Sequence, residues 1–171
     1  MTRIQNDIHL LPSILDRLTD DDPENSAEPS QSRGQLLRDL KASVRRDLQN
    51  LLSTRRRCVA HPPELDELKK SLVNYGVRDF TGHNFTASSD GHRQASDREI
   101  LRSEIENSIR LFEPRFKTVR VRLLDNAVPE DRTVRLRIDA VLHAHPTPEP
   151  VRFDSLLEPS NCSVKVTEQQ S

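Results

Sequence analysis

Residues 109–123 read Ile-Arg-Leu-Phe-Glu-Pro-Arg-Phe-Lys-Thr-Val-Arg-Val-Arg-Leu, and the spacing of their apolar side chains changes in the middle. Up to Phe112 the apolar residues follow the three-to-four step of an amphipathic helix. From Val119 onward they alternate with arginines, which is typical of a strand with one buried face. Pro114 lies between the two patterns, and its ring cannot continue a helix. The stretch therefore predicts a corner at which a helix passes into a strand.

The corner itself is the tripeptide Glu113-Pro114-Arg115. Pro114 favours an extended backbone at Glu113. In extended backbone, residues two apart point to the same side, so Glu113 and Arg115 are presented together. A carboxylate and a guanidinium in this arrangement suit bidentate pairing with a partner. We therefore regard all three residues as candidates for partner binding, and the plainer interpretation is a helix end with two solvated charges.

Apolar periodicity elsewhere places helices before strands. Three main helices are predicted: over residues 36–52, from Pro62 to a left-handed cap at Gly76, and from Ser96, in a capping box with Glu99, to Glu113. Strands are predicted at 119–123, 134–142 and 151–153, with a fourth candidate at 162–166. We expect an α+β fold, in which the helices pack on one face of a small antiparallel C-terminal sheet of three to four strands.

The chain divides into four predicted regions. Residues 1–19 form a helical anchor segment, because apolar residues between Ile8 and Leu18 recur at helical spacing. Residues 20–34 are rich in Asp, Glu, Ser and Pro and read as a flexible acidic linker. Residues 35–167 form the α+β domain, and residues 168–171 form a disordered tail. The anchor is expected to dock either on its own domain or on a neighbouring protein.

The composition limits the classes of function. The 171 residues carry a formal net charge of −1, which excludes a global basic field for nucleic acid. No apolar run approaches the length of a membrane span, and no secretory signal is evident. Cys58 and Cys162 lie far apart and are expected to be free thiols. These features predict a cytoplasmic protein that does not insert into a membrane.

Arginines repeat on the outward face of the predicted hairpin. Arg120 and Arg122 on one strand lie near Arg135 and Arg137 on the next, and Arg152 is expected to join them. Like charges opposite each other destabilise a sheet mildly. Three explanations stay open for this basic face: an acidic partner protein, coverage by an acidic segment of the chain such as the linker or simple solvation, and nucleic acid. The four hairpin arginines are therefore candidates for partner binding.

No motif for a metal, a cofactor or a nucleophile emerges from the sequence. Cys58 and His61 have a C-x2-H spacing, but no second tight pair completes a zinc pattern. The nucleophile elbow of hydrolases and a phosphate-binding loop are both absent. The remaining enzymatic alternative is a peptidoglycan-cleaving muramidase with Glu113 as its acid. Arg115 argues against that alternative, because an adjacent cation favours the ionised carboxylate.

Several segments together carry a resemblance to a known family. They are Ser-Ile-Leu-Asp-Arg-Leu at 13–18, Leu-Arg-Asp-Leu-Lys-Ala-Ser-Val-Arg-Arg-Asp-Leu at 37–48, Leu-Leu-Ser-Thr-Arg at 51–55, Ser-Leu-Val-Asn-Tyr-Gly at 71–76 with Asp79, and residues 109–116. In order and separation they resemble the TssE family of type VI secretion baseplate components. The wider family includes the baseplate wedge protein of contractile-tailed phages, which carries a lysozyme-like label. The resemblance covers about residues 11–157, and Ser53 departs from the expected Asn-Thr-Arg pattern.

The resemblance implies a structural, non-enzymatic role in a bacterial baseplate docked at the cytoplasmic side of the membrane. Its implied partners are the wedge proteins TssF and TssG, the sheath subunits TssB and TssC, and further baseplate components such as TssK. Proteins of this family offer a sheet at which the first ring of sheath subunits begins. The Glu-Pro-Arg motif maps to Glu113, Pro114 and Arg115, where it is implied to hold wedge proteins together. The resemblance implies no catalytic residue and no cofactor.

Overall fold

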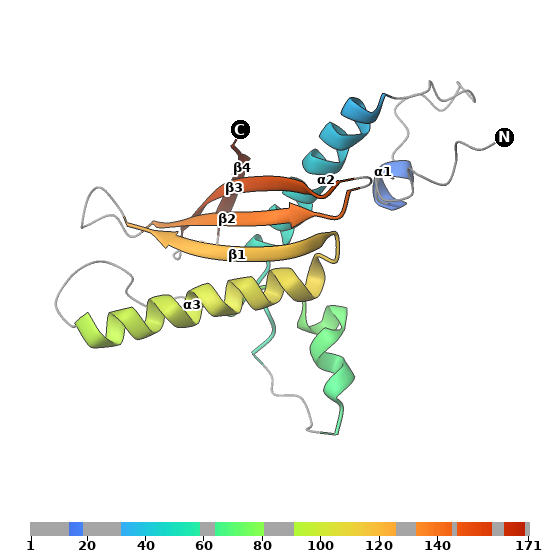
Figure 1. Ribbon diagram of the computed structural model, residues 1–171. Coiled ribbons are helices and arrows are strands. Elements are labelled where there is room, and N and C mark those ends of the chain that lie inside the picture. Colours follow the sequence, from blue (N-terminus) through green and yellow to red (C-terminus); the bar gives the residue numbers. More distant parts are fainter. Residues whose placement is uncertain are drawn as a thin grey trace.

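The computed structural model describes residues 14–18, 32–58, 64–80, 91–125, 133–144, 147–158 and 163–169. Helices precede strands along the chain. The helices are α1 (Ile14–Leu18), α2 (Arg33–Ser53) and α3 (Gly91–Phe112), and the strands are β1 (Phe116–Leu124), β2 (Val134–Leu142), β3 (Glu149–Glu158) and β4 (Ser163–Glu168). The predicted α+β class is confirmed, and the sheet has the fourth strand that the sequence left as a candidate (Figure 1).

The sheet is an antiparallel meander in the order β1-β2-β3-β4. Each strand pairs with the strand next to it in the sequence, so no strand crosses over another in this sheet. The alternation predicted for the hairpin holds, since Val119 and Val121 of β1 are buried while Arg120 and Arg122 are exposed. Strand β3 is longer than predicted and begins before Pro150, which lies near its first residue, where a proline is tolerated.

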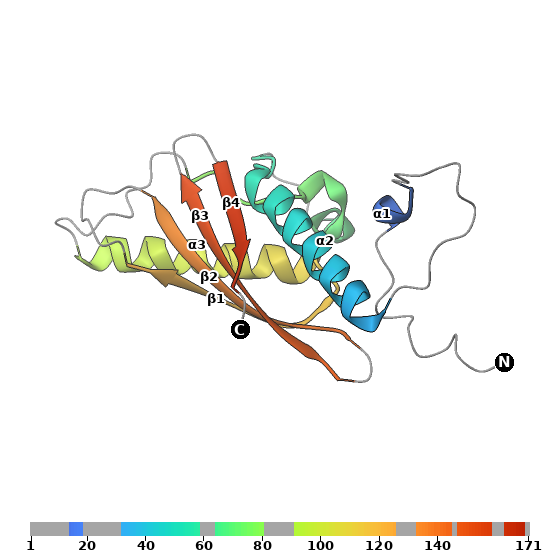
Figure 2. The same ribbon diagram turned by 90° about the horizontal axis from the view of Figure 1, so that it is seen from above.

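Both long helices pack on the apolar face of the sheet. Helix α3 lies against β1, and α2 lies alongside β4 (Figure 2). The core between helices and sheet holds side chains that are almost fully buried, among them Leu48, Leu101, Ile105, Ile138 and Phe153. Helix α2 contributes Leu40, Val44, Leu48 and Leu51, whose spacing of three and four residues puts them on one face. The Oγ of Ser32 caps this helix by accepting from the Gln35 amide at 3.3 Å.

The prediction of a second main helix, from Pro62 to Gly76, is wrong. In its place lie two short 3-10 helices, η2 (Asp66–Lys70) and η3 (Leu72–Asn74), interrupted at Ser71, which is extended. Leu65 and Leu72 would share one apolar face of such a helix, but they are 50% and 83% exposed. A helix in a protein is stabilised mainly by packing of its apolar face. This segment buries too few of its apolar side chains to stabilise a long helix.

The boundaries of the other two helices also differ from the prediction. Helix α3 begins at Gly91, so Ser96 lies inside the helix and is not its N-cap. Helix α2 begins at Arg33, inside the predicted linker. A polar segment can contain several residues able to cap a helix. Which of them marks the helix start depends on where the helix begins to pack on the sheet. Most of the predicted anchor and linker lies outside the described residues, so the predicted regions stay predictions.

Gly76 lies where two segments of backbone meet. Its φ is +110°, a conformation that glycine adopts without strain. A Cβ atom placed there would lie 2.5 Å from the carbonyl oxygen of Thr54. The next residue, Val77, donates its amide to that same oxygen at 2.9 Å and accepts from the Arg56 amide at 2.8 Å. Gly76 therefore joins the end of α2 to the 77–80 segment. Thr54, not Ser53, closes the α2 turn by donating its Oγ1 to the Asn50 carbonyl.

We expect Gly76→Ala to lower the free energy of unfolding by about 1–3 kcal/mol, because the side chain meets backbone at a positive φ. Urea denaturation followed by circular dichroism measures this. The matched control is Gly34→Ala in α2, where an added Cβ meets nothing within 4 Å. That control should be neutral or stabilising by up to about 1 kcal/mol. Equal effects of the two substitutions would contradict the role given to Gly76.

Candidate functional site

The Glu113-Pro114-Arg115 corner connects α3 to β1 as predicted. Helix α3 ends at Phe112, and β1 begins at Phe116. The Glu113 amide still donates to the Ile109 carbonyl at 2.9 Å, completing the last helical turn. The His143 amide donates to the Arg115 carbonyl at 2.8 Å, which ties the corner to the end of β2. Pro114 is exposed at the tip of the corner.

Glu113 and Arg115 point to the same side, as expected, and they bind each other. Nε of Arg115 lies 2.6 Å from Oε1 of Glu113, and Nη2 lies 2.5 Å from Oε2. The Arg115 amide also donates to Oε1 at 3.2 Å. Glu113 is only 4% exposed, so its carboxylate faces inward and both oxygens are occupied. This is the bidentate geometry predicted for a partner, and here it forms within the chain.

Helix α2 supplies two more contacts to Arg115. Nη2 lies 2.5 Å from Oδ2 of Asp47, and Nη1 lies 3.1 Å from Oγ of Ser43. Asp47 in turn lies 3.6 Å from Nε of Arg46, and Nη2 of Arg46 lies 2.6 Å from Oδ1 of Asp16 in α1. The Arg115 cluster, defined as Ser43, Asp47, Glu113 and Arg115, thus joins α2 to the corner, and Arg46 extends it to α1.

Sequence reasoning missed Ser43 and Asp47. They are four residues apart and lie next to the apolar row of α2, which contains Val44 and Leu48. Two polar residues on the edge of a buried face signal a buried polar contact, because a polar group loses free energy there unless it is hydrogen-bonded. Nothing in the local pattern, however, identifies Arg115 as their partner.

The cluster raises the pKa of one of its members, Arg115, and of one neighbouring residue, Tyr75. Burial by itself lowers the pKa of Arg115, but the hydrogen bonds and charges of Glu113 and Asp47 outweigh it and raise that pKa. Arg115 therefore stays charged at every relevant pH. Tyr75 packs edge-on against Phe112, with ring centroids 5.2 Å apart. Burial and the carboxylates of Asp47 and Glu113 raise the pKa of the Tyr75 phenol.

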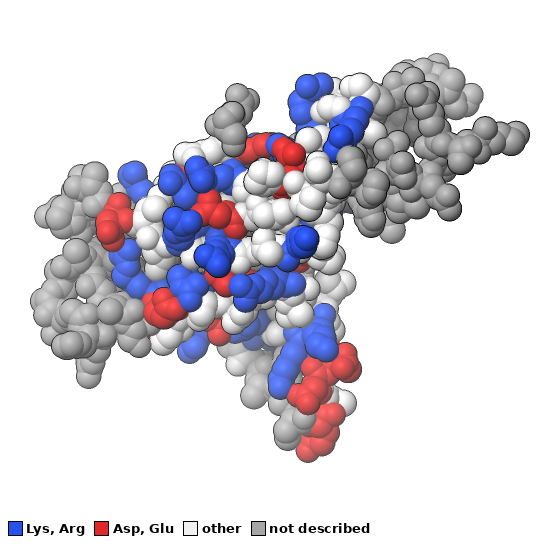
Figure 3. Space-filling view, viewed as in Figure 1, with Lys and Arg blue, Asp and Glu red and all other residues white. Residues whose placement is uncertain are grey.

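The four predicted hairpin arginines all lie on the outer face of the sheet, together with Arg152. Arg122 stands directly opposite Arg137, whereas Arg120 and Arg152 both face Asp139 in the register. The sheet supplies its own carboxylates between them. Asp139 lies 3.1 Å from Arg122 and 2.9 Å from Arg152, and Asp154 lies 2.9 Å from Arg137. Figure 3 shows this face, with basic side chains gathered over the sheet and acidic ones among them.

The outer face keeps an excess of positive charge. Its described basic residues are Arg120, Arg122, Arg135, Arg137, Arg152 and Lys165, and its acidic residues are Asp139, Asp154 and Glu158. A groove of about 300 Å³ crosses it, with Arg120 and Arg152 on its walls and Asp139 between them. The groove therefore presents two guanidinium groups with the carboxylate of Asp139, which pairs with Arg152, between them.

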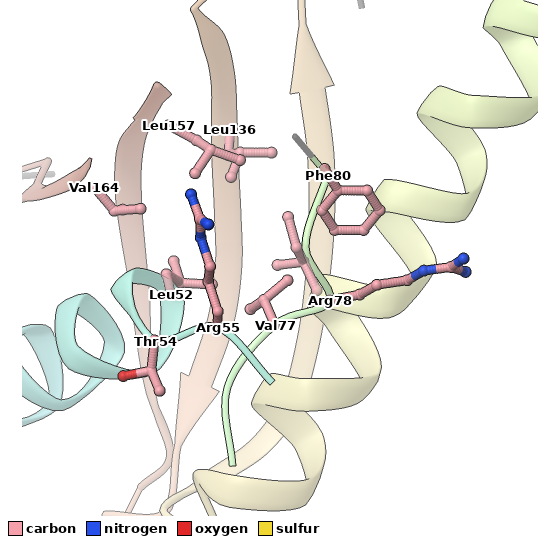
Figure 4. A pocket seen from close by; sticks show the side chains of 10 residues that line it. Leu52, Thr54, Arg55, Val77, Arg78, Phe80, Leu136, Leu157 and Val164 are labelled. Atoms are coloured by element: carbon pink, nitrogen blue, oxygen red, sulfur yellow. The ribbon is translucent and has the colours of Figure 1, made fainter. Parts of the chain in front are cut away.

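A second hollow lies at the other side of the sheet, at the end of α2. It is an apolar cavity of about 20 Å³, lined by Leu52, Leu157 and Val164 among others (Figure 4). A space of this size holds no more than a water-sized group. Neither the cavity nor the groove includes Glu113.

The described part of the chain contains no group of three or more His, Cys, Asp or Glu side chains placed to hold a metal ion. His61 and Cys162, which the sequence analysis considered, lie outside the described residues. Within the described segments, every helix is too short or too polar to cross a membrane.

We expect Arg115→Ala to lower the free energy of unfolding by about 3 kcal/mol, because it leaves the buried Glu113 carboxylate without its cation. Thermal and urea unfolding measure this. Arg122→Ala is the matched control, since Arg122 forms an ion pair but its side chain is 66% exposed. The control should change stability by less than about 1 kcal/mol. Adding Glu113→Gln to Arg115→Ala should restore part of the loss, and a lack of any restoration would argue against the pair.

Tyr75 is the only tyrosine of a chain without tryptophan, so its absorbance near the phenolate band reports one group. In the folded protein we expect it to ionise above the ordinary pKa of about 10. Because the folded pKa is raised, the neutral phenol contributes stability that is fully present below the unfolded pKa. That stability is lost as the pH rises through the folded pKa. Asp47→Asn should lower the Tyr75 pKa and Glu99→Gln should not; an unchanged midpoint in Asp47→Asn would contradict the assignment.

One protein-family model matches the part of the chain that contains the Arg115 cluster. The family model described as baseplate wedge protein gp25 matches residues 38–147, a span that contains most of α2, the whole Arg115 cluster, α3, β1 and β2. A comparison with curated proteins finds no match. The resemblance to the TssE family is confirmed, because TssE belongs to the family that this model describes. The chain is a member of the gp25 baseplate wedge family.

Proposed function

We propose that the chain is a non-enzymatic structural subunit of a type VI secretion baseplate, located in the bacterial cytoplasm at the membrane-docked baseplate. It would bridge the wedge proteins TssF and TssG, with components such as TssK, to the contractile sheath. It would also help the sheath subunits TssB and TssC to begin polymerising. The observation that carries this proposal is the family match across residues 38–147, which includes the corner and the first two strands.

The Arg115 cluster supports a contact with wedge proteins at the corner. Pro114 is exposed, and the side chain of Arg115 keeps 26% of its surface accessible although three groups of the chain hold it. A guanidinium fixed in this way loses little further side-chain entropy when a partner binds. Glu113, which is buried, would act by positioning Arg115, and Pro114 with the accessible part of Arg115 would make the contact.

The outer face of the sheet supports a second contact, with an acidic protein surface. Over the whole outer face, the six described basic side chains, Arg120, Arg122, Arg135, Arg137, Arg152 and Lys165, outnumber the three acidic ones, Asp139, Asp154 and Glu158. Complementary charge raises association rates and suppresses wrong partners more than it adds affinity. The ion pairs within the face weaken its attraction for any anionic partner, an acidic protein as well as nucleic acid, since Arg122, Arg137 and Arg152 already bind carboxylates.

No observation favours the muramidase alternative. A general acid must carry a proton and reach the glycosidic oxygen. Glu113 is 4% exposed, and both of its oxygens accept hydrogen bonds from Arg115, so neither oxygen is placed to reach a glycosidic bond. The arrangement suits a structural ion pair and not a sugar-binding cleft.

We expect the tagged full-length chain to recover TssF and TssG from a cytoplasmic extract, identified by mass spectrometry, and Pro114→Ala to recover less of both. This variant keeps the Glu113–Arg115 pair intact, so a loss of binding reports the contact and not the fold. Arg115→Ala, compared at a temperature at which it remains folded, should lose binding more completely. The control is the exposed cation pair Lys69→Ala with Lys70→Ala, outside the corner.

Recovery of neither wedge nor sheath subunits by the wild type would sink the baseplate proposal. Peptidoglycan hydrolysis by the purified chain, abolished in Glu113→Gln, would establish the alternative. Recovery that is equal in Pro114→Ala, Arg115→Ala and the wild type would keep the baseplate role and remove the corner from it.

A further inference from the structure

The side chains on the outer face of the sheet form rows that cross β1, β2 and β3. Two neighbouring rows, read from the register, are Thr118–Val141–Pro150 and Arg120–Asp139–Arg152. Residues two apart on a strand are separated by about 7 Å, so the two rows are in contact distance of one long side chain. The groove of about 300 Å³ runs over both rows. One part of the outer face is therefore hollowed, with an uncharged row beside a charged one.

Arg120 differs from the other arginines of the groove and its surroundings. Asp139 faces it directly across the β1–β2 pair, but other arginines take both carboxylate oxygens of Asp139. Oδ1 of Asp139 lies 2.9 Å from Nε of Arg152, and Oδ2 lies 3.1 Å from Nη2 of Arg122. Among the described residues, no carboxylate pairs with Arg120. Arg120 therefore offers an unused fork of N–H donors at the wall of the groove.

The groove lies at the same end of the sheet as the Glu113-Pro114-Arg115 corner. The start of β1 and the end of β2 meet there, next to the end of α3 (Figure 1). The His143 amide, just beyond β2, donates to the Arg115 carbonyl at 2.8 Å. Thr118 of the groove lies four residues after Pro114, so the chain between them spans at most about 14 Å. A protein bound at the corner therefore has the groove beside it.

Strand β1 is irregular between the corner and the groove. The register shifts between Phe116 and Thr118, so Lys117 is an extra residue on this strand. Lys117 and Thr118 are consequently both exposed, although alternation would bury one of them. Bulges of this kind are frequent next to functional sites, where they redirect a side chain. The bulge thus adds a second cation that has no ion pair within the described chain.

We propose that the wedge protein at the corner continues into this groove, where one of its carboxylates binds Arg120 and an adjacent apolar side chain packs on Val141 and Pro150. The proposal rests on the function proposed above and narrows its second contact to one end of the outer face. The charge favours an acid, because two arginines of the groove share the single carboxylate of Asp139. A free guanidinium binds a carboxylate through two parallel hydrogen bonds. Val141 is partly exposed and Pro150 is exposed, so both can receive an apolar side chain.

The test compares two variants that each remove one cation without a described ion pair from the outer face. Arg120→Ala changes the groove, whereas Lys165→Ala changes the far end of the face, where Lys165 is opposite Leu156. Affinity of the purified full-length chain for the co-expressed TssF–TssG complex is measured by biolayer interferometry. It should fall about tenfold in Arg120→Ala and less than about twofold in Lys165→Ala. Arg120→Lys keeps the charge but loses the fork, so its affinity should lie between those of the wild type and Arg120→Ala.

A third variant occupies the groove from within the chain. Val141→Asp places a carboxylate diagonally opposite Arg120, within reach of a long side chain. This carboxylate should pair with Arg120, repel the acid of the partner and remove the apolar contact. Affinity for TssF–TssG should therefore fall by at least about tenfold, and thermal unfolding confirms that the variant is folded. An unchanged affinity in Val141→Asp would contradict the proposal.

The outcomes separate the groove from the wedge role. If Arg120→Ala binds TssF–TssG as tightly as the wild type, the groove is overturned and the wedge role stands. Equal losses in Arg120→Ala and Lys165→Ala would show attraction by overall charge and would also overturn the groove. Weaker binding of co-expressed TssB and TssC by Arg120→Ala, with TssF–TssG unaffected, would overturn the choice of partner. If the wild type does not bind TssF–TssG, the wedge contact fails and its continuation into the groove fails with it.

Discussion

The guanidinium of Arg115 is the contact on which the arrangement of helices and sheet depends. Glu113 can be buried at the end of α3 only because Arg115 neutralises it through two hydrogen bonds. The remaining donors of Arg115 reach Ser43 and Asp47 on α2, so one side chain fixes the helix-to-strand corner and the helix that packs across the core. Pro114 sets the local turn, but it makes none of these bonds. The corner is therefore held by charge at the point where α2, α3 and β1 approach one another.

The same chemistry recurs on the sheet with a different result. On the outer face Asp139 and Asp154 relieve the repulsion between opposed arginines such as Arg122 and Arg137. The sheet can therefore form although the face keeps a net positive charge. At the β1 edge Glu106 accepts from the Val121 amide and Arg110 donates to the Val119 carbonyl, in place of main-chain partners for these two groups. Charged side chains of this protein thus serve first as connectors within the chain, and only the remaining positive charge is assigned to a partner under the proposed function.

The candidate site was predictable in part. Pro114 and the two-residue spacing of Glu113 and Arg115 predicted the corner and the shared direction of their side chains, because both follow from local backbone geometry. Asp47 and Ser43 were not predictable, since they lie 68 and 72 residues away in sequence from Arg115. Nor could the sequence tell that Glu113 would be saturated within the chain. That depends on how Arg115 is held, and its second carboxylate partner, Asp47, lies on a helix whose position is set by core packing.

The sequence by itself determined the features that follow from local periodicity. These are the amphipathic helices α2 and α3, the alternating strands, and the face on which Arg120 and Arg137 lie. These patterns need only the next few residues to be read. Tertiary structure decided the rest. The segment with Leu65 and Leu72 became two short turns because its apolar side chains found too little to pack against. The β1 edge closed because α3 crosses it at Glu106 and Arg110. Such outcomes depend on which distant surfaces meet, and no window of sequence contains that information.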